Sequence, residues 1–309
     1  MPAFRLHALT VAALLACSVG AFAGDEPPHM RSESIGSYVV PEANQAIAVD
    51  AEHFYAIDNR TIAKYDKLTQ KLVQKWERPK DGPIKHFDSA TVVDGKIYLA
   101  HSNYPDWPMA SSLEIFDAAT LTHVATHSFG IQIGSFTWVD KGPDGNWYGG
   151  FANYNRVFDK SQMAYGNKYN TQIVRFDANW QPVEQWTIPD AVVEKFEDMS
   201  NSGGSWGPDG KLYLSGHDPA EAYVMQLPEM GTVLDWIATV PLDNHGQGIA
   251  WDRSQKDIVY AIIRGEGDQP NRVTVNRVMF EANRLRDTPA IVHNRRIQSS
   301  ALMWLSGRL

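Results

Sequence analysis

The chain has 309 residues, a formal net charge of −8 and a hydrophobic content of 43%. Its length fits one large domain or two small ones. The sequence has no cluster of lysine and arginine residues, which argues against the basic surface that a nucleic-acid partner requires.

Residues 1–23 have the features of a secretory signal peptide. Arg5 precedes a mostly apolar run over residues 6–19, and Ala21-Phe22-Ala23 matches an A-x-A cleavage site. The run is short for a bilayer span, so no transmembrane span is predicted. We therefore expect a mature chain over residues 24–309 that is periplasmic or secreted. Lipidation of Cys17, which would make the protein a lipoprotein, is the alternative.

Cys17 is the only cysteine of the chain. Once residues 1–23 are removed, the mature chain can form no disulfide and offers no thiol nucleophile or thiolate metal ligand. Its stability must then come from the core, and a chain of this size can bury one.

Five segments of the chain resemble one another. Each has a small-residue opening, a short apolar strand, a polar turn and a second strand with a tyrosine. They begin at residues 45, 88, 134, 203 and 246, and the tyrosines are Tyr55, Tyr98, Tyr148, Tyr213 and Tyr260. Asp-Gly pairs at 94–95, 144–145 and 209–210 are typical of tight hairpins.

Each segment continues with two further strands. The third ends in an aromatic–acid pair, as in "TIAKYD", "SLEIFD" and "TQIVRFD", and the fourth follows in runs such as "KLVQKWE". Four antiparallel strands in a repeat of about 45 residues predict an all-β fold, a single β-propeller over residues 24–309. One such sheet has two apolar faces, so neighbouring blades must cover each other.

The two ends of the chain bear on the number of blades. The C-terminal "RRIQSSALMWLSGRL" resembles "FGIQIGSFTWVDKG" of an earlier repeat, which favours six blades with a sparse sixth. Residues 37–40 read as the outer strand of the last blade, so strands from both termini would close the ring. A five-bladed propeller is the alternative, with the C-terminal stretch as packing.

The "SLEIFD"-type strands and Asp-Gly hairpins resemble those of a broad propeller group that includes gluconolactonase-like, strictosidine-synthase-like and YncE-like proteins. The resemblance covers most of residues 35–305. It implies the architecture and does not by itself imply an activity.

A ligand site is expected on the face where first strands begin and second strands end. The first-strand entries on this face are Gln45, His86, Asp88, Ser135, Asn201, Ser202, His245 and Gln247. The second-strand exits are Asp58, Asn59, His101, Asn103, Asn153, Tyr154, His217, Asp218, Arg264 and Glu266. Three long loops, which begin near residues 103, 154 and 188, should overhang the same face. We expect them to form a lid with aromatic walls around a small ligand, or else merely to cover the channel.

One motif could indicate a serine nucleophile. Residues 203–207 spell G-x-S-x-G, but a nucleophile elbow needs a helix after the serine. Ser205 is followed by a Pro-Asp-Gly turn and a strand. We therefore predict that Ser205 lines the channel and is not a nucleophile.

Four histidines belong to the expected ligand face: His86, His101, His217 and His245. Imidazole binds transition metals and also acts as a general base near neutral pH. One prediction is a metal site of His101, His217 and His245 that binds Zn or Fe. Other roles remain open, namely acid–base catalysis, ligand binding, or simple hydrogen bonds to loop backbone.

Resemblance to the gluconolactonase-like enzymes implies a divalent ion such as Ca²⁺, held by oxygen ligands at the channel mouth. Asn103, Asn153 and Asp218 match those positions, but Gln45 stands where that family has a glutamate. This departure weakens the transfer of the metal site to the present chain.

These observations predict an exported propeller with a site for a small polar molecule. The enzyme hypothesis is a metal-assisted hydrolase, such as a lactonase or esterase, or an isomerase, with His217, His245 and Asp218 as catalytic residues. The expected ligand-binding residues are His86, Asn103, Asn153, Tyr154, Gln247 and Arg264. The alternative is a non-catalytic propeller that binds a small ligand or a partner protein.

Overall fold

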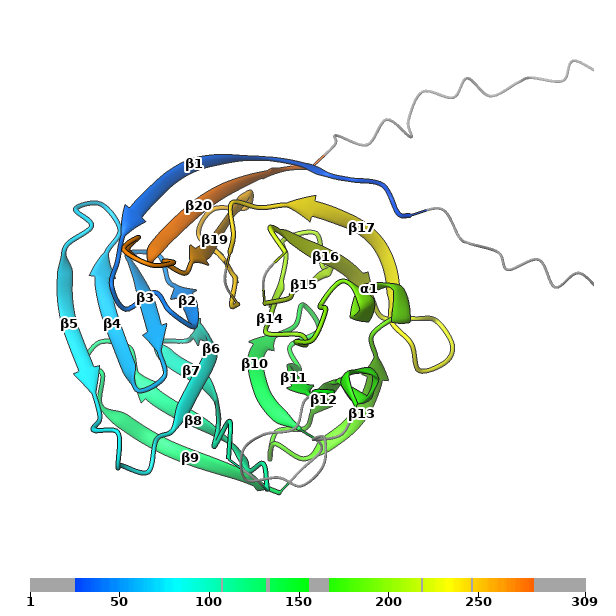
Figure 1. Cartoon of the computed structure of the whole chain (residues 1–309), viewed down its shortest axis with the longest axis horizontal. Coiled ribbons are helices and arrows are strands. Elements are labelled where there is room, and N and C mark those ends of the chain that lie inside the picture. Colours follow the sequence, from blue (N-terminus) through cyan, green and yellow to red (C-terminus); the bar gives the residue numbers. More distant parts are fainter. Residues whose placement is uncertain are drawn as a thin grey trace, which may run out of the picture.

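Five antiparallel sheets of four strands each surround a central channel in the computed structural model of the chain (Figure 1). The structure describes residues 26–280 apart from 107, 132–133, 156–166, 218 and 246. Blade 1 holds β2 (Ala46–Val49), β3 (His53–Asp58), β4 (Thr61–Asp66) and β5 (Leu72–Glu77). Blade 2 holds β6 (His86–Val93), β7 (Lys96–Ser102), β8 (Ser111–Asp117) and β9 (His123–Gly130).

The other blades repeat this order from the channel outward. Blade 3 holds β10 (Ser135–Lys141), β11 (Trp147–Ala152), β12 (Gln172–Phe176) and β13 (Pro182–Thr187). Blade 4 holds β14 (Gly203–Trp206), β15 (Leu212–Ser215), β16 (Glu221–Gln226) and β17 (Asp235–Pro241). Blade 5 holds β18 (Ala250–Trp251), β19 (Ile258–Ile263), β20 (Arg272–Met279) and β1 (Arg31–Val39). The short helices η1 (Lys168–Asn170) and α1 (Asp190–Glu194) lie in connecting loops.

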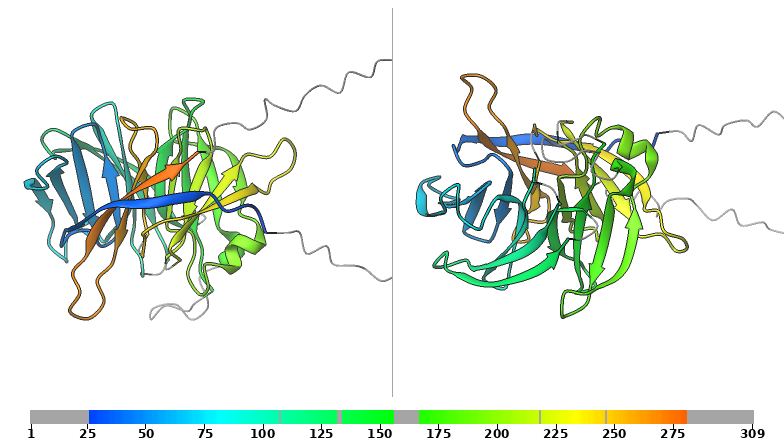
Figure 2. Two further views of the ribbon diagram at one scale, coloured as in Figure 1. Left: turned by 90° about the horizontal axis from the view of Figure 1, so that it is seen from above. Right: turned by 60° about the horizontal axis from the view of Figure 1, so that its bottom comes forward.

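The prediction of six blades is wrong, and the five-bladed alternative is confirmed. β1 pairs with β20 in antiparallel register and completes the fifth sheet, as Figure 1 shows at the edge of the ring and Figure 2 shows from two further sides. The N-terminal strand is therefore the outer strand of the last blade, as expected. The C-terminal stretch that suggested a sixth blade and the predicted signal peptide both lie outside the described residues.

Each predicted Asp-Gly pair forms the turn of an inner hairpin. Asp94 and Gly95 join β6 to β7 and have φ of 50° and 72°. A two-residue turn with two positive φ angles matches the twist of paired strands. Gly145 and Gly210 have φ of 82° and 73° at the corresponding turns of blades 3 and 4.

Small residues line the channel because the inner strands approach one another closely. A Cβ atom on Gly204 would lie 2.4 Å from the Trp138 ring of the neighbouring blade. Any larger residue in this part of β14 would push blades 3 and 4 apart. This close approach accounts for the glycine pair that gave the G-x-S-x-G match.

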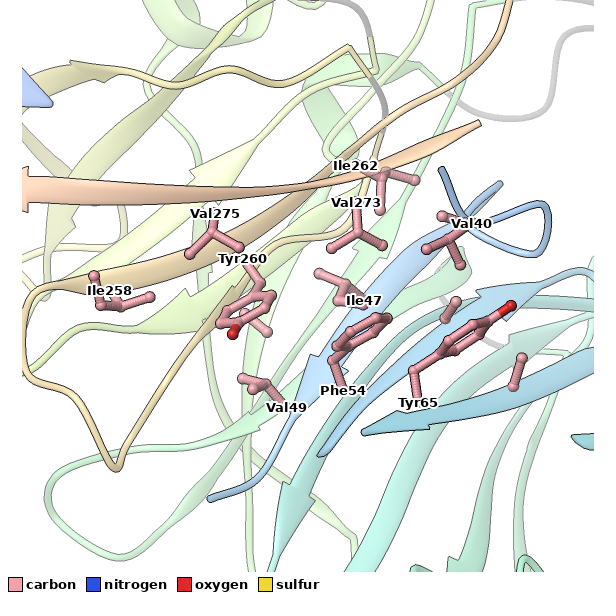
Figure 3. Packing of buried hydrophobic residues seen from close by; sticks show 14 residues of the cluster. Val40, Ile47, Val49, Phe54, Tyr65, Ile258, Tyr260, Ile262, Val273 and Val275 are labelled. Carbon is pink, nitrogen blue, oxygen red and sulfur yellow. The ribbon is translucent and has the colours of Figure 1, made fainter. Parts of the chain in front are cut away.

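Apolar side chains between the sheets join one blade to the next. Where the ring closes, Ile47, Val49 and Phe54 of blade 1 pack against Tyr260 and Ile262 of blade 5 (Figure 3). The Phe54 and Tyr260 rings lie 6.2 Å apart between centroids. The closing joint is thus a dry aromatic–aliphatic interface, built like the rest of the core.

One carboxylate ties four blades together at the far end of the channel. Asp140 is 1% exposed, and its Oδ1 accepts from Thr91 at 2.8 Å and from Arg253 at 2.6 Å. Its Oδ2 accepts from the Ser205 hydroxyl at 3.1 Å and the Trp206 backbone N–H at 2.8 Å. Ser205 therefore lines the channel, as predicted.

Among the helices in the part of the chain that the structure describes, none is long and apolar enough to cross a membrane.

Asp140→Asn tests this interblade contact. An amide keeps one acceptor oxygen but turns donors toward Ser205 and Trp206, and it leaves Arg253 without its charge partner. We expect the free energy of unfolding to fall by about 3 kcal/mol, measured by urea denaturation. The upper end of such losses is not reached because the Arg253 side chain is 43% exposed.

The matched control is Asp257→Asn, which breaks the exposed ion pair with Arg277. It should change stability by less than about 1 kcal/mol. Equal effects of the two substitutions would contradict a special role for Asp140.

Candidate functional site

A cavity of about 330 Å³ opens at the end of the channel where the inner strands begin. We call it the entry pocket. Its lining residues are Gln45, Asn59, Arg60, Lys85, His86, Asp88, Tyr104, Pro105, Tyr154, Met199, Ser202, His217, Gln247 and Arg264. Tyr104, Tyr154 and Met199 come from the three long loops, one from each, so the loops meet on the expected face.

A chain of hydrogen bonds with a fixed direction runs along one wall. Asn59 Nδ2 donates to Asp58 at 3.2 Å, so its Oδ1 faces the pocket and accepts from Gln45 Nε2 at 3.1 Å. Gln45 Oε1 in turn accepts from Arg264 Nη2 at 2.8 Å. Because each amide has one donor end and one acceptor end, every orientation in this chain depends on the next.

Arg264 stands at the centre of the pocket. Its Nε donates to the Asn44 carbonyl at 2.5 Å, and its Nη1 lies 2.9 Å from His217 Nε2. The guanidinium can only donate, so His217 Nε2 accepts and its proton lies on Nδ1. With the Gln247 carboxamide oxygen turned toward Arg264, its nitrogen lies 3.2 Å from Asp88 Oδ1.

The same chain fixes the tautomer of His86. Its Nδ1 lies 2.5 Å from Asn59 Oδ1, which can only accept, so His86 carries a proton on Nδ1. The other ring nitrogen, Nε2, lies 3.6 Å from Asp88 Oδ2. Two groups that can each hold a proton therefore face one another inside the pocket.

Asp88 is 2% exposed. Burial raises the pKa of its carboxyl above the ordinary value, and His86, Arg264 and His217 oppose that rise only in part. A carboxyl that holds its proton more tightly, next to an imidazole, is suited to general acid–base chemistry.

Two aromatic side chains from the long loops also line the pocket. The Tyr104 ring lies 5.0 Å from the His86 ring and 5.6 Å from the Tyr154 ring between centroids. Tyr104 belongs to the loop after β7, and Tyr154 follows β11. These rings offer a flat apolar surface beside the polar chain.

Five of the residues predicted to be catalytic or ligand-binding line the entry pocket: His86, Tyr154, His217, Gln247 and Arg264. Asn103 and Asn153 lie outside its lining. Asn103 closes its own loop through the Pro108 carbonyl and the Ala110 N–H. Asn153 is buried and bonds to backbone at Asn170 and to Thr171. Asp218 lies outside the described residues.

His101 pairs with Phe87, next to the pocket residue His86, but His101 itself does not line the pocket. Its Nδ1 bonds to Ser112 at 2.8 Å, and its Nε2 accepts from the Lys85 backbone N–H at 3.1 Å. Burial lowers the pKa of His101 to about 4. His101 therefore acts as a neutral support for the strand entry that carries Lys85 and His86.

His245 lies in a neighbouring cavity with Glu266, 3.1 Å from its carboxylate. Among the described residues no three His, Cys, Asp or Glu side chains cluster as a metal site would require. Both nitrogens of His101 are already bonded, Asn59 bonds to Gln45 and His86, and Gln45 bonds to Arg264. The described side chains thus do not fit the predicted three-histidine metal site.

Sequence reasoning placed Asp88 among the strand entries but gave it no catalytic role, and it missed Arg60, Lys85 and Tyr104. Asp88 sits two residues after His86 on β6, and the signal was present in "KHFD". Residues two apart on a strand point to the same side, so His86 and Asp88 share a face.

A larger cavity of about 530 Å³ lies at the other end of the channel, beside Lys141, Trp206 and Arg253. The Asp140 carboxylate, which bonds to Trp206 and Arg253 of this lining, already has partners in three other blades. The smaller entry pocket is the better candidate because convergent titratable groups, and not volume, mark a functional site.

No family model matches the sequence, and no curated protein is similar to it. Among solved structures, the GH43_1 enzyme of Xanthomonas citri in complex with xylotriose is similar with a TM-score of 0.54 and 12% identity, over 82% of this chain and 91% of that one. The PQQ-bound aldose sugar dehydrogenase of Streptomyces coelicolor has a TM-score of 0.52 and 12% identity, over 80% and 98%. At this identity the likeness shows the propeller fold alone.

Asp88→Asn tests the buried carboxyl through pH-dependent stability. The folded-state pKa of Asp88 lies above that of an unfolded aspartate, so wild-type stability falls as pH rises through the interval between the two values. Asparagine does not titrate, so the variant loses no stability in this interval. We expect the melting temperature of the variant, relative to wild type, to increase as the pH rises from about 4, the ordinary aspartate pKa, to pH 8. A change of 1 kcal/mol in relative stability corresponds to about 2–4 °C.

Thermal unfolding followed by circular dichroism measures this difference, with Asp257→Asn as the control that should track wild type. A constant difference between Asp88→Asn and wild type across this pH range would show that Asp88 is not perturbed.

Proposed function

We propose that the entry pocket binds a small polar molecule and that the Asp88–His86 pair catalyses proton transfer on it. The observation that carries the proposal is the buried carboxyl 3.6 Å from the free ring nitrogen of an imidazole whose other nitrogen is fixed.

Hydrolysis of an ester or lactone is the reaction class that this arrangement supports best. The pair accepts a proton from a water molecule as the water oxygen attacks the substrate carbonyl. The bond from the carbonyl carbon to the leaving oxygen then breaks, and the proton returns to that oxygen. An isomerisation would use the same pair to remove a proton from one carbon and return it to another.

Arg264 contributes its charge. Its donors bond to Asn44, Gln45 and His217, so the guanidinium is held in place before any ligand enters. A fixed positive charge near the reacting atoms stabilises negative charge that develops on a carbonyl oxygen. Gln45 and Asn59 are positioning residues, because they act through Arg264 and His86.

No step in this proposal requires a metal ion. The prediction of a metal-assisted reaction remains a separate hypothesis, and dialysis against a chelator distinguishes the two. Activity that survives the chelator supports proton transfer by side chains alone.

Turnover of a panel of chromogenic esters and lactones tests the proposal. Asp88→Asn and His86→Gln should each lower kcat/KM by about 10²–10⁴-fold, the usual contribution of general acid–base catalysis. Asp257→Asn on the outer surface should keep wild-type turnover. Asp88→Asn should also remove the ionisation of this group from the pH–rate profile.

Two results would count against the proposal that the Asp88–His86 pair is catalytic. Full activity of Asp88→Asn would place the reacting groups elsewhere. Ligand-induced thermal stabilisation with no turnover of any bound compound would favour a propeller that only binds its ligand.

A further inference from the structure

The charges around the entry pocket differ in sign from those of the chain as a whole. The protein has a net charge of −8, yet the pocket lining includes Arg60, Lys85 and Arg264 against a single acid, Asp88. That acid is buried, and burial raises its pKa, which reduces the negative charge it presents. The pocket is therefore a positive region on an acidic protein.

Two of these cations, Arg60 and Lys85, are lining residues that reach solvent, and we call this part of the pocket its mouth. Lys85 is exposed and directly precedes His86, and Arg60 is half-buried and directly follows Asn59. Among the residues that the structure describes, neither side chain has an acid within 4 Å. By contrast Lys67, Lys168 and Lys195 each have an acidic partner.

Arg60 and Lys85 flank the groups that we propose to be reactive. Asn59 fixes His86, and His86 faces Asp88, so the two cations come from the same short segments as these groups. A ligand atom beside Asp88 is buried, whereas Arg60 and Lys85 line the part of the same pocket that reaches solvent.

We propose that the ligand of the entry pocket is a small molecule that carries an oxyanion, a carboxylate or a phosphate. The anion lies at the mouth between Lys85 and Arg60, and the polar reacting part lies inward at His86 and Asp88. This inference rests on the proposed function for the inner part of the pocket.

Charge complementarity of this kind raises affinity and selects against neutral analogues. Arg60 can bond an oxyanion with two parallel N–H groups, and Lys85 supplies a mobile ammonium. Tyr104, which contacts the His86 ring, offers a face on which the carbon skeleton can rest. The two positive charges at the mouth also attract the anion at long range, and added salt shortens that range.

Three matched probes separate the possibilities: glucose, gluconate and glucose 6-phosphate. Each is titrated by calorimetry into the full chain at 20 mM and at 500 mM NaCl. We expect at least one of the two anions to bind at low salt, glucose to bind at least about tenfold more weakly, and the difference to shrink at high salt. The stronger of the two anions identifies carboxylate or phosphate.

The double variant Arg60→Gln, Lys85→Gln should lose about tenfold or more of the anion affinity, since each substitution removes a charge-assisted hydrogen bond. Lys256→Gln is the matched control, because Lys256 is exposed at the opposite end of the channel. It should bind as wild type does. Circular dichroism melting checks that all variants are folded.

Equal affinity for glucose and gluconate, unchanged anion binding by the double variant, or no binding of either anion would each overturn the oxyanion assignment. The proposed acid–base function is judged separately, by the turnover of Asp88→Asn on neutral esters and lactones. If that turnover falls as expected while the anions fail, only the ligand class is wrong.

Discussion

The carboxylate of Asp140 holds the inner strands of four blades at fixed positions around the channel. It accepts from Thr91, Ser205, Trp206 and Arg253, which belong to blades 2, 4 and 5, while itself belonging to blade 3. Apolar faces between blades tolerate sliding, because dispersion contacts have no preferred direction. A buried charge with directional partners does not, so Asp140 sets the spacing of the strands.

That spacing matters at the other end of the same strands. β6 carries Thr91, which bonds to Asp140, and also Asp88 and His86, which line the entry pocket. Thr91 thus helps to hold the strand that carries the two proposed acid–base groups, and the register between β6 and β7 shifts between Phe87 and Ala90. The amides of Gln45 and Asn59 then complete the positioning across blade 1. The polar contacts that hold the blades together thus lie at one end of the inner strands, and the polar groups of the entry pocket lie at the other end.

The fold was largely predictable from sequence, and the site only in part. Asp94-Gly95 indicated a hairpin because few residue types accept two positive φ angles, and the pairs at 144–145 and 209–210 did so because glycine accepts the one positive φ of those turns. The sixth blade was wrongly predicted because the C-terminal stretch resembles an earlier repeat, whereas β1 completes the fifth sheet and closes the ring. His101 was misplaced because its register opposite Ser112 on β8, which turns it away from the pocket, depends on strand pairing that sequence does not reveal. The role of Asp88 depends on burial, which is a property of the assembled ring.

The pairing of β1 with β20 joins residues 31–39 to residues 272–279, the first and last strands that the structure describes. Such a contact closes a loop of most of the protein, and folds dominated by distant pairings form slowly. The entry pocket draws residues from all five blades, from Gln45 to Arg264. Its geometry is therefore complete only after the ring has closed. A chain that has folded four blades but not the fifth would have a nearly native core and no working site.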